Sequence, residues 1–301
     1  MPDTNPSLRP VSGSARDVWE LIGPWLAGEA EPIEIRTSGS TGEPKTIRLS
    51  REAVLASARA TLDHVGGPGL WLMALPPTGM GGFQVLVRSA LAGFEPVFLD
   101  DHVDLADAIV ALRARGPERA YLSLVPTQLH RLAESGTLGD LSIFDTVLLG
   151  GAATSKQLLA AAGAAGVNLV RTYGMTETAG GCIYEGYPLA GVQMRIETDG
   201  RISLAGPMLF DGAPTWWTTQ DLGRITDGRL EVVGRSDLVA VSGGVNIPLG
   251  AVETVLADVP TVQEVVVVAR ADAEWGDIVT ACVRGALDRQ TAADALQAAG
   301  H

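Results

Sequence analysis

The sequence predicts an α/β protein: a large N-terminal domain around a largely parallel sheet, then a small α+β domain. Three observations predict this architecture. Apolar runs of strand length alternate with helical patterns between residues 70 and 171, and each helix is long enough to cross back over a sheet. The third observation is a change of pattern after Gly174, where short strands and turn signals indicate an antiparallel β-rich piece.

The elements of the large domain follow in order. A helix over 16–26 precedes two strands around a glycine-rich stretch, and Ser50 is a predicted N-cap for a helix over 51–64. Pro126-Thr127 opens a further helix, with proline in its first turn. The remaining strands are predicted over 70–75, 95–99, 121–125, 146–149 and 168–171, and the remaining helices over 81–91, 103–115 and 155–165.

The antiparallel piece and the C-terminal domain come next. Asp199-Gly200 and Asp227-Gly228 are hairpin-type turns. The predicted strands cover 193–197, 201–204, 223–226, 230–233, 264–269 and 278–283, and the predicted helices cover 249–256 and 291–299. We therefore expect a large domain over 1–234, with a β-rich subdomain over 185–234, a hinge at 235–238 and a small, shortened domain over 239–301.

Composition excludes several classes of protein. A net charge of −13 argues against sequence-independent binding to nucleic acid or to an anionic membrane. No window approaches the run of about 18 apolar residues that a membrane span requires. Cys182 and Cys282 lie far apart and form no metal or disulfide pattern, so a cytoplasmic location is expected. Only Lys45 and Lys156 are lysines, so each needs a role.

The stretch around which the chain is organised is the glycine loop, residues 37–45. It combines hydroxyl side chains, glycines and one lysine: Thr37, Ser38, Gly39, Ser40, Thr41, Gly42 and Lys45. Glycine allows backbone N–H groups to turn toward a ligand, and hydroxyl and ammonium groups add donors, so the loop suits phosphate oxygens. It lacks Walker A spacing. A flexible turn between two strands is the alternative, and composition alone does not separate the two.

Four segments in order carry a family resemblance. The glycine loop resembles the motif [ST]-S-G-[ST]-T-G-x-P-K, and residues 173–177 resemble Y-G-x-T-E. Residues 219–223 resemble T-x-D-x-G, and residues 234–237 resemble a hinge motif. Together they resemble the adenylate-forming, acyl-CoA-synthetase-like superfamily. Residues 123–129, 148–153 and 180–184 further resemble the o-succinylbenzoate–CoA ligases of menaquinone biosynthesis, in their short actinobacterial form.

The resemblance implies an ATP- and Mg²⁺-dependent ligase that uses CoA as co-substrate. In it, the glycine loop and Lys45 would hold the β- and γ-phosphates, Thr176 would donate to the α-phosphate, and Glu177 would bind Mg²⁺. Adenine would lie between Tyr173-Gly174 and Gly150-Gly151-Ala152. A polar turn at Thr176-Glu177 and a buried Tyr173 are the alternatives.

The resemblance also assigns the ribose and the acyl substrate. Asp221 and Arg235 would bind the ribose hydroxyls, or would form an ion pair at the surface. Domain rotation would occur at Asp237. Residues expected at the acyl substrate are Arg88, Ser123, Thr127 and Gly180. Arg88 lies in an apolar stretch and needs a partner, which is either a substrate carboxylate or a structural Asp or Glu.

The sequence departs from the family pattern in three places. No lysine follows Arg235, whereas the superfamily carries a C-terminal catalytic lysine; a truncated chain and a shortened homologue both explain this. Thr78 replaces a frequent histidine, and Val241 replaces a polar residue or lysine. A different aryl- or acyl-CoA ligase and a non-catalytic nucleotide- or acyl-binding protein are therefore the rival functions. The resemblance is compatible with a homodimer.

Overall fold

A computed structural model describes residues 6–28, 31–37 and 45–300. The chain divides into two compact units. The first contains residues 1–152, 161–193 and 205–215, and the second contains residues 153–160, 194–204 and 216–301. The domain limits predicted at 234 and 239, with a hinge between them, stay predictions.

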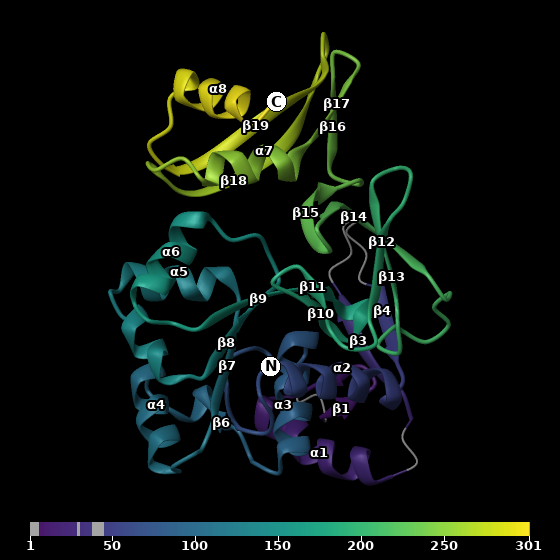
Figure 1. The fold of residues 1–301 in the computed structure, drawn as a ribbon, viewed down its shortest axis with the longest axis vertical. Helices are drawn as coiled ribbons and strands as arrows, with labels where there is room; N and C mark the ends of the chain where they lie inside the picture. The colour runs from purple at the N-terminus through teal and green to yellow at the C-terminus, as the bar shows by residue number, and fades with distance from the viewer. Residues whose placement is uncertain (1–5, 29–30, 38–44, 301) are drawn as a thin grey trace. The chain divides into compact units, whose positions relative to one another are not determined.

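The first unit is organised by a seven-stranded sheet in the order β11-β10-β9-β8-β7-β5-β6 (Figure 1). The predicted parallel sheet is confirmed over five of these strands, which pair in parallel. Their bounds are β5 Leu70–Met73, β6 Val97–Phe98, β7 Ala120–Leu124, β8 Thr146–Leu149 and β9 Leu169–Met175. β10 (Gly180–Tyr184) and β11 (Tyr187–Pro188) return antiparallel at one edge. β9 is longer than predicted because its second half pairs with β10.

Crossover direction decides which helices cover which face of this sheet. The chain passes from β5 to β6 in one direction along the sheet, and from β6 through β7 and β8 to β9 in the other. Right-handed crossovers therefore place α3 (Met80–Ala92) on one face and α4 (Leu105–Ala114) and α5 (Pro126–Glu134) on the opposite face (Figure 1). α1 (Ala15–Ala27) and α2 (Arg51–His64) join the face of α3.

Burial of the central strands follows from their position between two helical layers. Every residue of β5, β7 and β8 is buried, as expected for parallel strands covered on both faces. The largest fully buried side chains include Trp71, Tyr121 and Phe83. The Trp71 and Tyr121 rings, on paired strands, have centroids 5.0 Å apart. This core fixes the positions of the side chains at the ends of the strands.

Local sequence signals set several ends of elements. The Ser50 hydroxyl accepts a hydrogen bond from the Ala53 amide at 3.1 Å, which confirms the predicted N-cap of α2. α5 begins at Pro126, as predicted. α6 (Lys156–Ala164) completes the set of helices between the parallel strands. Two strands, β3 (Ile33–Thr37) and β4 (Lys45–Leu49), form the predicted antiparallel pair around the glycine loop. Short pieces complete this unit: β1 Ser7–Leu8, β2 Val11–Ser12, and 3₁₀ turns over Leu99–Asp101, Leu138–Ile143 and Thr176–Thr178.

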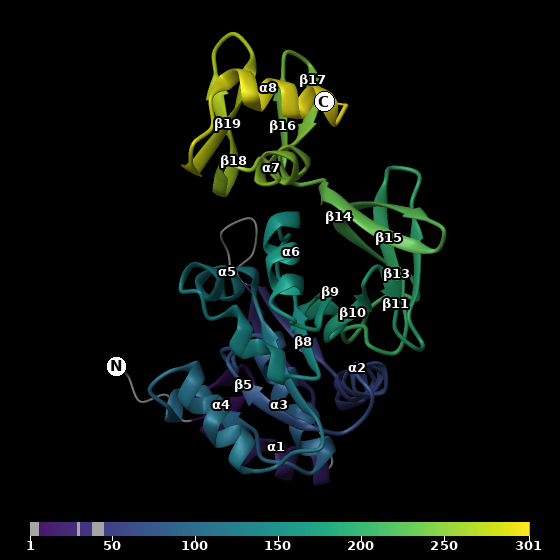
Figure 2. The same ribbon diagram turned by 60° about the vertical axis from the view of Figure 1, so that its left-hand side comes forward.

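The second unit contains most of an antiparallel sheet of β12 (Gln193–Ile196), β13 (Arg201–Ala205), β14 (Trp217–Thr226) and β15 (Arg229–Arg235). Figure 2 shows β14 and β15 as a long hairpin. Its turn has positive φ at Asp227 and Gly228, 52° and 76°, and this confirms the predicted hairpin turn.

A further sheet, in the order β17-β16-β19-β18, carries two helices on one face. Its elements are β16 Val239–Ser242, β17 Val245–Pro248, β18 Val262–Asp272, β19 Gly276–Gly285, α7 Leu249–Ala257 and α8 Arg289–Ala298. The β16–β17 hairpin was not among the predicted strands. Gly243 and Gly244 make its two-residue turn, with φ of 57° and 80°.

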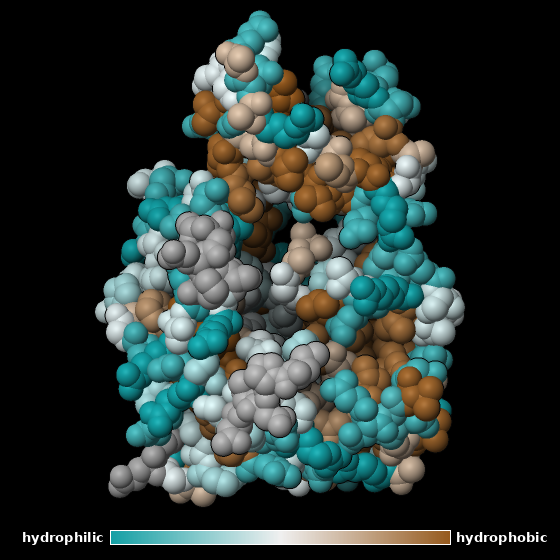
Figure 3. Space-filling view, turned by 180° about the vertical axis from the view of Figure 1, so that it is seen from behind, coloured by the Kyte–Doolittle hydropathy of each residue, from teal (hydrophilic) through white to brown (hydrophobic). Residues whose placement is uncertain are grey.

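The other face of this sheet is exposed and mixes apolar with charged side chains, including the Arg284–Glu264 ion pair. Successive side chains of a strand point to opposite faces. Val265 and Val267 therefore pack under the helices, while Val266 and Val268 point outward and are 51% and 37% exposed. Apolar residues of this unit are drawn brown in Figure 3. In the described ranges no helix combines the length and apolarity needed to cross a membrane.

Candidate functional site

The predicted site residues of the first unit gather at the carboxyl end of the parallel sheet. Ser123 lies near the end of β7, Gly150 follows β8, and the Thr176–Thr178 turn follows β9. Thr127 lies in the first turn of α5, directly after β7. In open α/β sheets, ligands bind at this edge where the direction of crossover reverses, which here is between β5 and β7.

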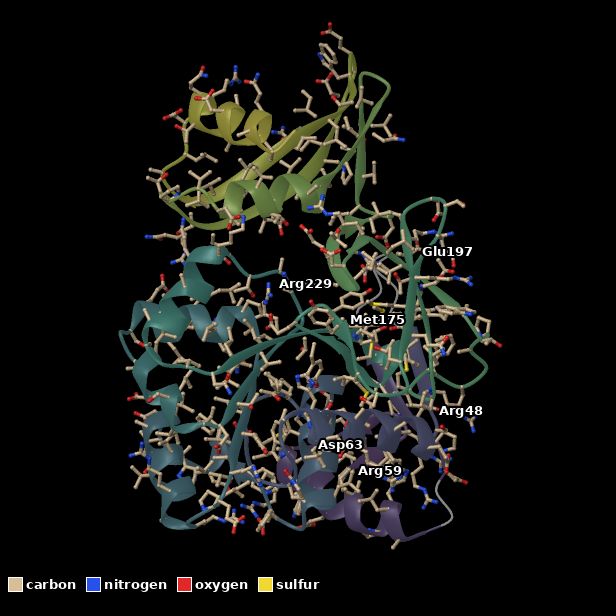
Figure 4. The ribbon with its side chains drawn as sticks, viewed as in Figure 1. Arg48, Arg59, Asp63, Met175, Glu197 and Arg229 are labelled. Atoms are coloured by element: carbon tan, nitrogen blue, oxygen red, sulfur yellow. The ribbon has the colours of Figure 1, made fainter. Side chains whose placement is uncertain are left out.

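The turn that carries Thr176 and Glu177 is closed by its neighbours. The Thr178 hydroxyl accepts a hydrogen bond from the Met175 amide at 2.9 Å and donates to the carbonyl oxygens of Met175 and Gly180, at 3.0 Å and 2.7 Å. Met175, labelled in Figure 4, ends β9 at the start of this turn. The Glu177 carbonyl accepts from the Phe210 amide at 3.0 Å. Backbone and Thr178 thus fix the turn without using its predicted functional side chains.

The side chains of Thr176 and Glu177 form no hydrogen bond or ion pair with any other residue that the structure describes. Both are only partly buried. A carboxylate and a hydroxyl on a fixed turn provide two ligand groups at once. The described residues hold no cluster of three or more His, Cys, Asp or Glu side chains with metal-binding geometry. Mg²⁺ typically binds one or two carboxylates together with substrate phosphates, so Glu177 fits such an ion.

Glycine is required by close packing at two predicted positions. A Cβ atom on Gly174 would lie 2.1 Å from the Gly180 carbonyl oxygen, because β9 and β10 cross closely there. A Cβ atom on Gly150 would lie 2.4 Å from the Thr172 hydroxyl oxygen. The backbone next to Tyr173 is therefore tightly packed at Thr172 and Gly174, and the adenine role of Tyr173 stays a prediction.

Arg88 is a buried cation on α3. It is 4% exposed, and its Nε donates to the Gln84 carbonyl at 3.0 Å. Its Nη2 donates to the Ser123 hydroxyl at 3.4 Å, so the structure brings these two predicted residues together. Burial lowers the pKa of the Arg88 guanidinium to about 10. No described Asp or Glu pairs with it, so the structural carboxylate expected as an alternative is absent from the described residues.

The other neighbours of Arg88 are aromatic. Its Cζ lies 4.2 Å from the centroid of the Trp71 ring. The Tyr184 hydroxyl is a further polar neighbour of the guanidinium and lies 2.9 Å from the Thr61 hydroxyl. Sequence analysis missed Trp71 and Tyr184, because each lies in an apolar run with no polar pattern around it. The Arg88 cage, which we define as Trp71, Ser123, Tyr184 and the Gln84 carbonyl, is entirely neutral.

Asp221 and Arg235 lie opposite each other on β14 and β15 of the second unit. Arg235 Nη1 donates to Asp221 Oδ1 at 3.0 Å, and the other side of the guanidinium forms a bidentate pair with Asp237, with both bonds at 2.8 Å. Asp221 is 8% exposed, and its amide donates to the Thr219 hydroxyl at 3.0 Å. The ion pair weighed as an alternative is present. The ribose role and the hinge role of Asp237 stay predictions.

The glycine loop is described only at its two ends. Thr37 and Lys45 face each other as the last pair of the β3–β4 ladder, and the Thr37 hydroxyl donates to the Lys45 carbonyl at 3.3 Å. The predicted phosphate ligands Ser38, Gly39, Ser40, Thr41 and Gly42 lie outside the described residues. Lys45 itself is exposed. Cys182 is 1% exposed, and burial raises the pKa of its thiol to about 12.

The AMP-binding enzyme family matches residues 35–212, and the chain belongs to this family. The match spans the glycine loop, Arg88, the Thr176–Glu177 turn and the whole parallel sheet.

Two of the similar proteins carry the same activity in their names. A probable 2-succinylbenzoate–CoA ligase of Mycobacterium tuberculosis is 40% identical over 284 residues, which are 87% of this chain and 74% of that protein. The 2-succinylbenzoate–CoA ligase of Listeria monocytogenes is 30% identical over 291 residues, covering 88% of this chain and 62% of that protein.

A solved structure shares the fold. It is the o-succinylbenzoate CoA synthetase (MenE) from Bacillus subtilis in complex with the acyl-adenylate intermediate OSB-AMP, with a TM-score of 0.73 and 27% identity. The match covers 88% of this chain and 62% of that one. The same enzyme in complex with ATP and magnesium ion has a TM-score of 0.72 and 25% identity. The chain thus spans about three quarters of the mycobacterial relative and about 60% of the other two proteins.

Proposed function

We propose that this protein is a 2-succinylbenzoate–CoA ligase of menaquinone biosynthesis, which activates its acid with ATP and Mg²⁺ and transfers the acyl group to CoA. The observation that carries the proposal is the buried charge of Arg88 in a neutral cage. The names of the relatives support the same substrate.

The state of Arg88 favours a dicarboxylate substrate. A buried charge without a counterion costs free energy, and the lowered pKa of Arg88 corresponds to about 3 kcal/mol. A carboxylate beside the guanidinium would recover this cost through charge-assisted hydrogen bonds. The second carboxylate of the substrate is then left for reaction. Ser123, next to Arg88, would complete acid binding together with Thr127 and Gly180, which the resemblance assigns to the acid.

The proposed nucleotide contacts follow the resemblance. The glycine loop with Lys45 holds the β- and γ-phosphates, Thr176 donates to the α-phosphate, and Tyr173 with Gly150–Ala152 holds adenine. Asp221 and Arg235 bind the ribose. Mg²⁺, when bound at Glu177, supplies positive charge to the phosphates. These residues position the groups and stabilise charge, which are the two main contributions in phosphoryl-centred chemistry.

Two half-reactions follow. A carboxylate oxygen attacks the α-phosphorus, the bond to pyrophosphate breaks, and acyl-AMP forms. The thiolate sulfur of CoA, its proton given to solvent, then attacks the acyl carbon and AMP leaves. Rotation about Asp237 between the two steps, a homodimer and a cytoplasmic location remain part of the proposal.

The direct test is mass-spectrometric detection of both products from ATP, Mg²⁺, CoA and 2-succinylbenzoate. We expect 2-succinylbenzoyl-AMP without CoA and its CoA thioester with CoA. A panel of benzoates and fatty acids, each with one carboxylate, serves as the comparison. Equal or faster turnover of a panel acid would identify a different acyl-CoA ligase. Saturable ATP binding with no adenylate from any acid would identify a non-catalytic binding protein.

Substitution of Glu177 by glutamine tests the proposed metal contact. The amide keeps the size of the side chain but removes its charge, so Mg²⁺ loses a ligand that the turn holds in place. We expect adenylation to fall about 10²-fold, within the range of single electrostatic contacts, and half-saturation by Mg²⁺ to move to higher concentration. Thermal stability should not change, because Glu177 has no side-chain partner among the described residues. An unchanged Mg²⁺ dependence would contradict the assignment.

A further inference from the structure

Gln84 lies one helical turn before Arg88 on α3, at the point where three segments of the first unit meet. It is 4% exposed. Its side-chain Nε2 donates to the Val54 carbonyl on α2 at 3.1 Å and to the Ala179 carbonyl at 2.8 Å. Ala179 is the residue that ends the Thr176–Thr178 turn. A single amide group therefore ties two helices to the turn that carries Thr176 and Glu177.

The same residue also holds Arg88. The Gln84 backbone carbonyl accepts the hydrogen bond from Arg88 Nε at 3.0 Å. Gln84 is thus bonded through its backbone to the buried cation and through its side chain to the Thr176–Glu177 turn. Among the described residues, two hydrogen bonds of Gln84 therefore connect Arg88, at the proposed acid site, with the turn at the proposed phosphate site.

The orientation of the Gln84 amide is unambiguous. Both neighbours of Nε2 are carbonyl oxygens, which only accept, so the NH₂ end must face them. The Oε1 atom is buried and has no hydrogen-bond partner among the described residues. An unsatisfied buried acceptor is unfavourable for the fold. The Gln84 side chain therefore donates to both carbonyls although its own Oε1 is left without a partner, which lowers the stability of the fold.

The backbone of the turn matches this side chain. Ala179 and Gly180 have positive φ, 49° and 105°, which points the Ala179 carbonyl toward α3. A Cβ atom on Gly180 would approach Gln84 Cγ to 3.3 Å, so the turn packs directly on the glutamine. Left-handed backbone at a non-glycine residue such as Ala179 is unfavourable and persists where the surroundings hold it.

We propose that Gln84 is a positioning residue that holds the Thr176–Glu177 turn in register with the acid bound at Arg88. This inference rests on the proposed function, because the acid site and the phosphate site are both assigned there. Correct spacing matters for a ligand that occupies both sites at once, and a displacement of about 1 Å can cost about 10²-fold in such cases. It matters little for a ligand that occupies only one.

The test compares one-site and two-site ligands in the Gln84→Met variant. Methionine has a similar length and helix propensity but no N–H to donate. The probes are 2-succinylbenzoate alone, ATP with Mg²⁺ alone, and a non-hydrolysable analogue of the acyl-adenylate, each titrated by calorimetry against the full chain. We expect the Kd values of the acid and of ATP to stay within about 2-fold of wild type, and the Kd of the analogue to rise about 10-fold.

A matched control separates positioning from stability. Val85→Ala removes buried volume on the same helix, and Val85 has no side-chain hydrogen-bonding group. Melting temperatures of both variants are measured alongside the titrations. A loss of analogue affinity in Gln84→Met no larger than in Val85→Ala would overturn the positioning role alone. Failure of the wild-type chain to bind 2-succinylbenzoate would overturn the proposed function, and the positioning role with it.

Discussion

Replacement of Arg88 by methionine should strongly reduce ligation of 2-succinylbenzoate while leaving the protein about as stable as before. Methionine fills a similar elongated space without a charge. The substitution removes the desolvation cost of about 3 kcal/mol that the lowered pKa of Arg88 reflects. It also removes the contact with Trp71, worth about 2 kcal/mol at a desolvated site, and the hydrogen bond to Ser123. The two effects nearly cancel. The expected change in melting temperature is therefore no more than a few degrees in either direction.

The effect on activity should be large. Loss of a charge-assisted contact in a buried site costs about 3–5 kcal/mol, so kcat/KM for 2-succinylbenzoate should fall about 10²–10⁴-fold. ATP affinity should not change. A monocarboxylate analogue, which has no group for Arg88, should lose little when the variant is compared with wild type. A variant that melts many degrees lower, with acid affinity retained, would show that Arg88 is structural.

Replacement of Gly174 by alanine should damage both stability and activity. The added Cβ would lie 2.1 Å from the Gly180 carbonyl oxygen and 2.7 Å from the Gly181 Cα, and both atoms belong to backbone. β9 and β10 must separate to make room, at a cost of about 3 kcal/mol. Because the Thr176–Glu177 turn joins these two strands, kcat for adenylation should fall about 10²-fold or more. Denaturant unfolding and single-turnover adenylation measure the two effects.

Gly163 offers the matched control for this substitution. It lies within α6, is exposed, and has no heavy atom within 4 Å of an added Cβ. Alanine there should stabilise the helix by about 0.5–1 kcal/mol and leave adenylation unchanged. Equal stability of Gly174→Ala and Gly163→Ala would mean that the close approach of β9 and β10 is not needed for the fold.

Periodicity and turn residues were sufficient to predict the parallel sheet, its helices and the β14–β15 hairpin. Apolar runs as short as four residues marked β5 and β8, because both of their faces are buried. The return strand β10 was missed. Its residues Gly180 and Gly181 have no side chains to alternate, so no strand pattern exists in the sequence. The β16–β17 hairpin was also missed, because each of its strands is only four residues long.

The site could be predicted where its residues form motifs local in sequence. Thr176, Glu177, Asp221 and Arg235 were placed by short motifs, and the structure confirms the contact of Asp221 with Arg235. Arg88 was suspected because a charge interrupts an apolar helix. Its aromatic neighbours come from β5 and β10, far away in the chain, and only tertiary packing brings Trp71 and Tyr184 to it. Gln84 gave no signal for the same reason.

The neutrality of the Arg88 cage has an evolutionary consequence. A buried arginine paired with a carboxylate is difficult to replace, since loss of either partner leaves the other as an unpaired buried charge. Arg88 has no such partner among the described residues. A single mutation of Arg88 to an apolar residue therefore needs no second mutation to restore stability. Selection on this position therefore acts through the ligand and hardly through folding. A descendant that has turned to acids with one carboxylate should lose this arginine early and keep Trp71, which also packs in the core.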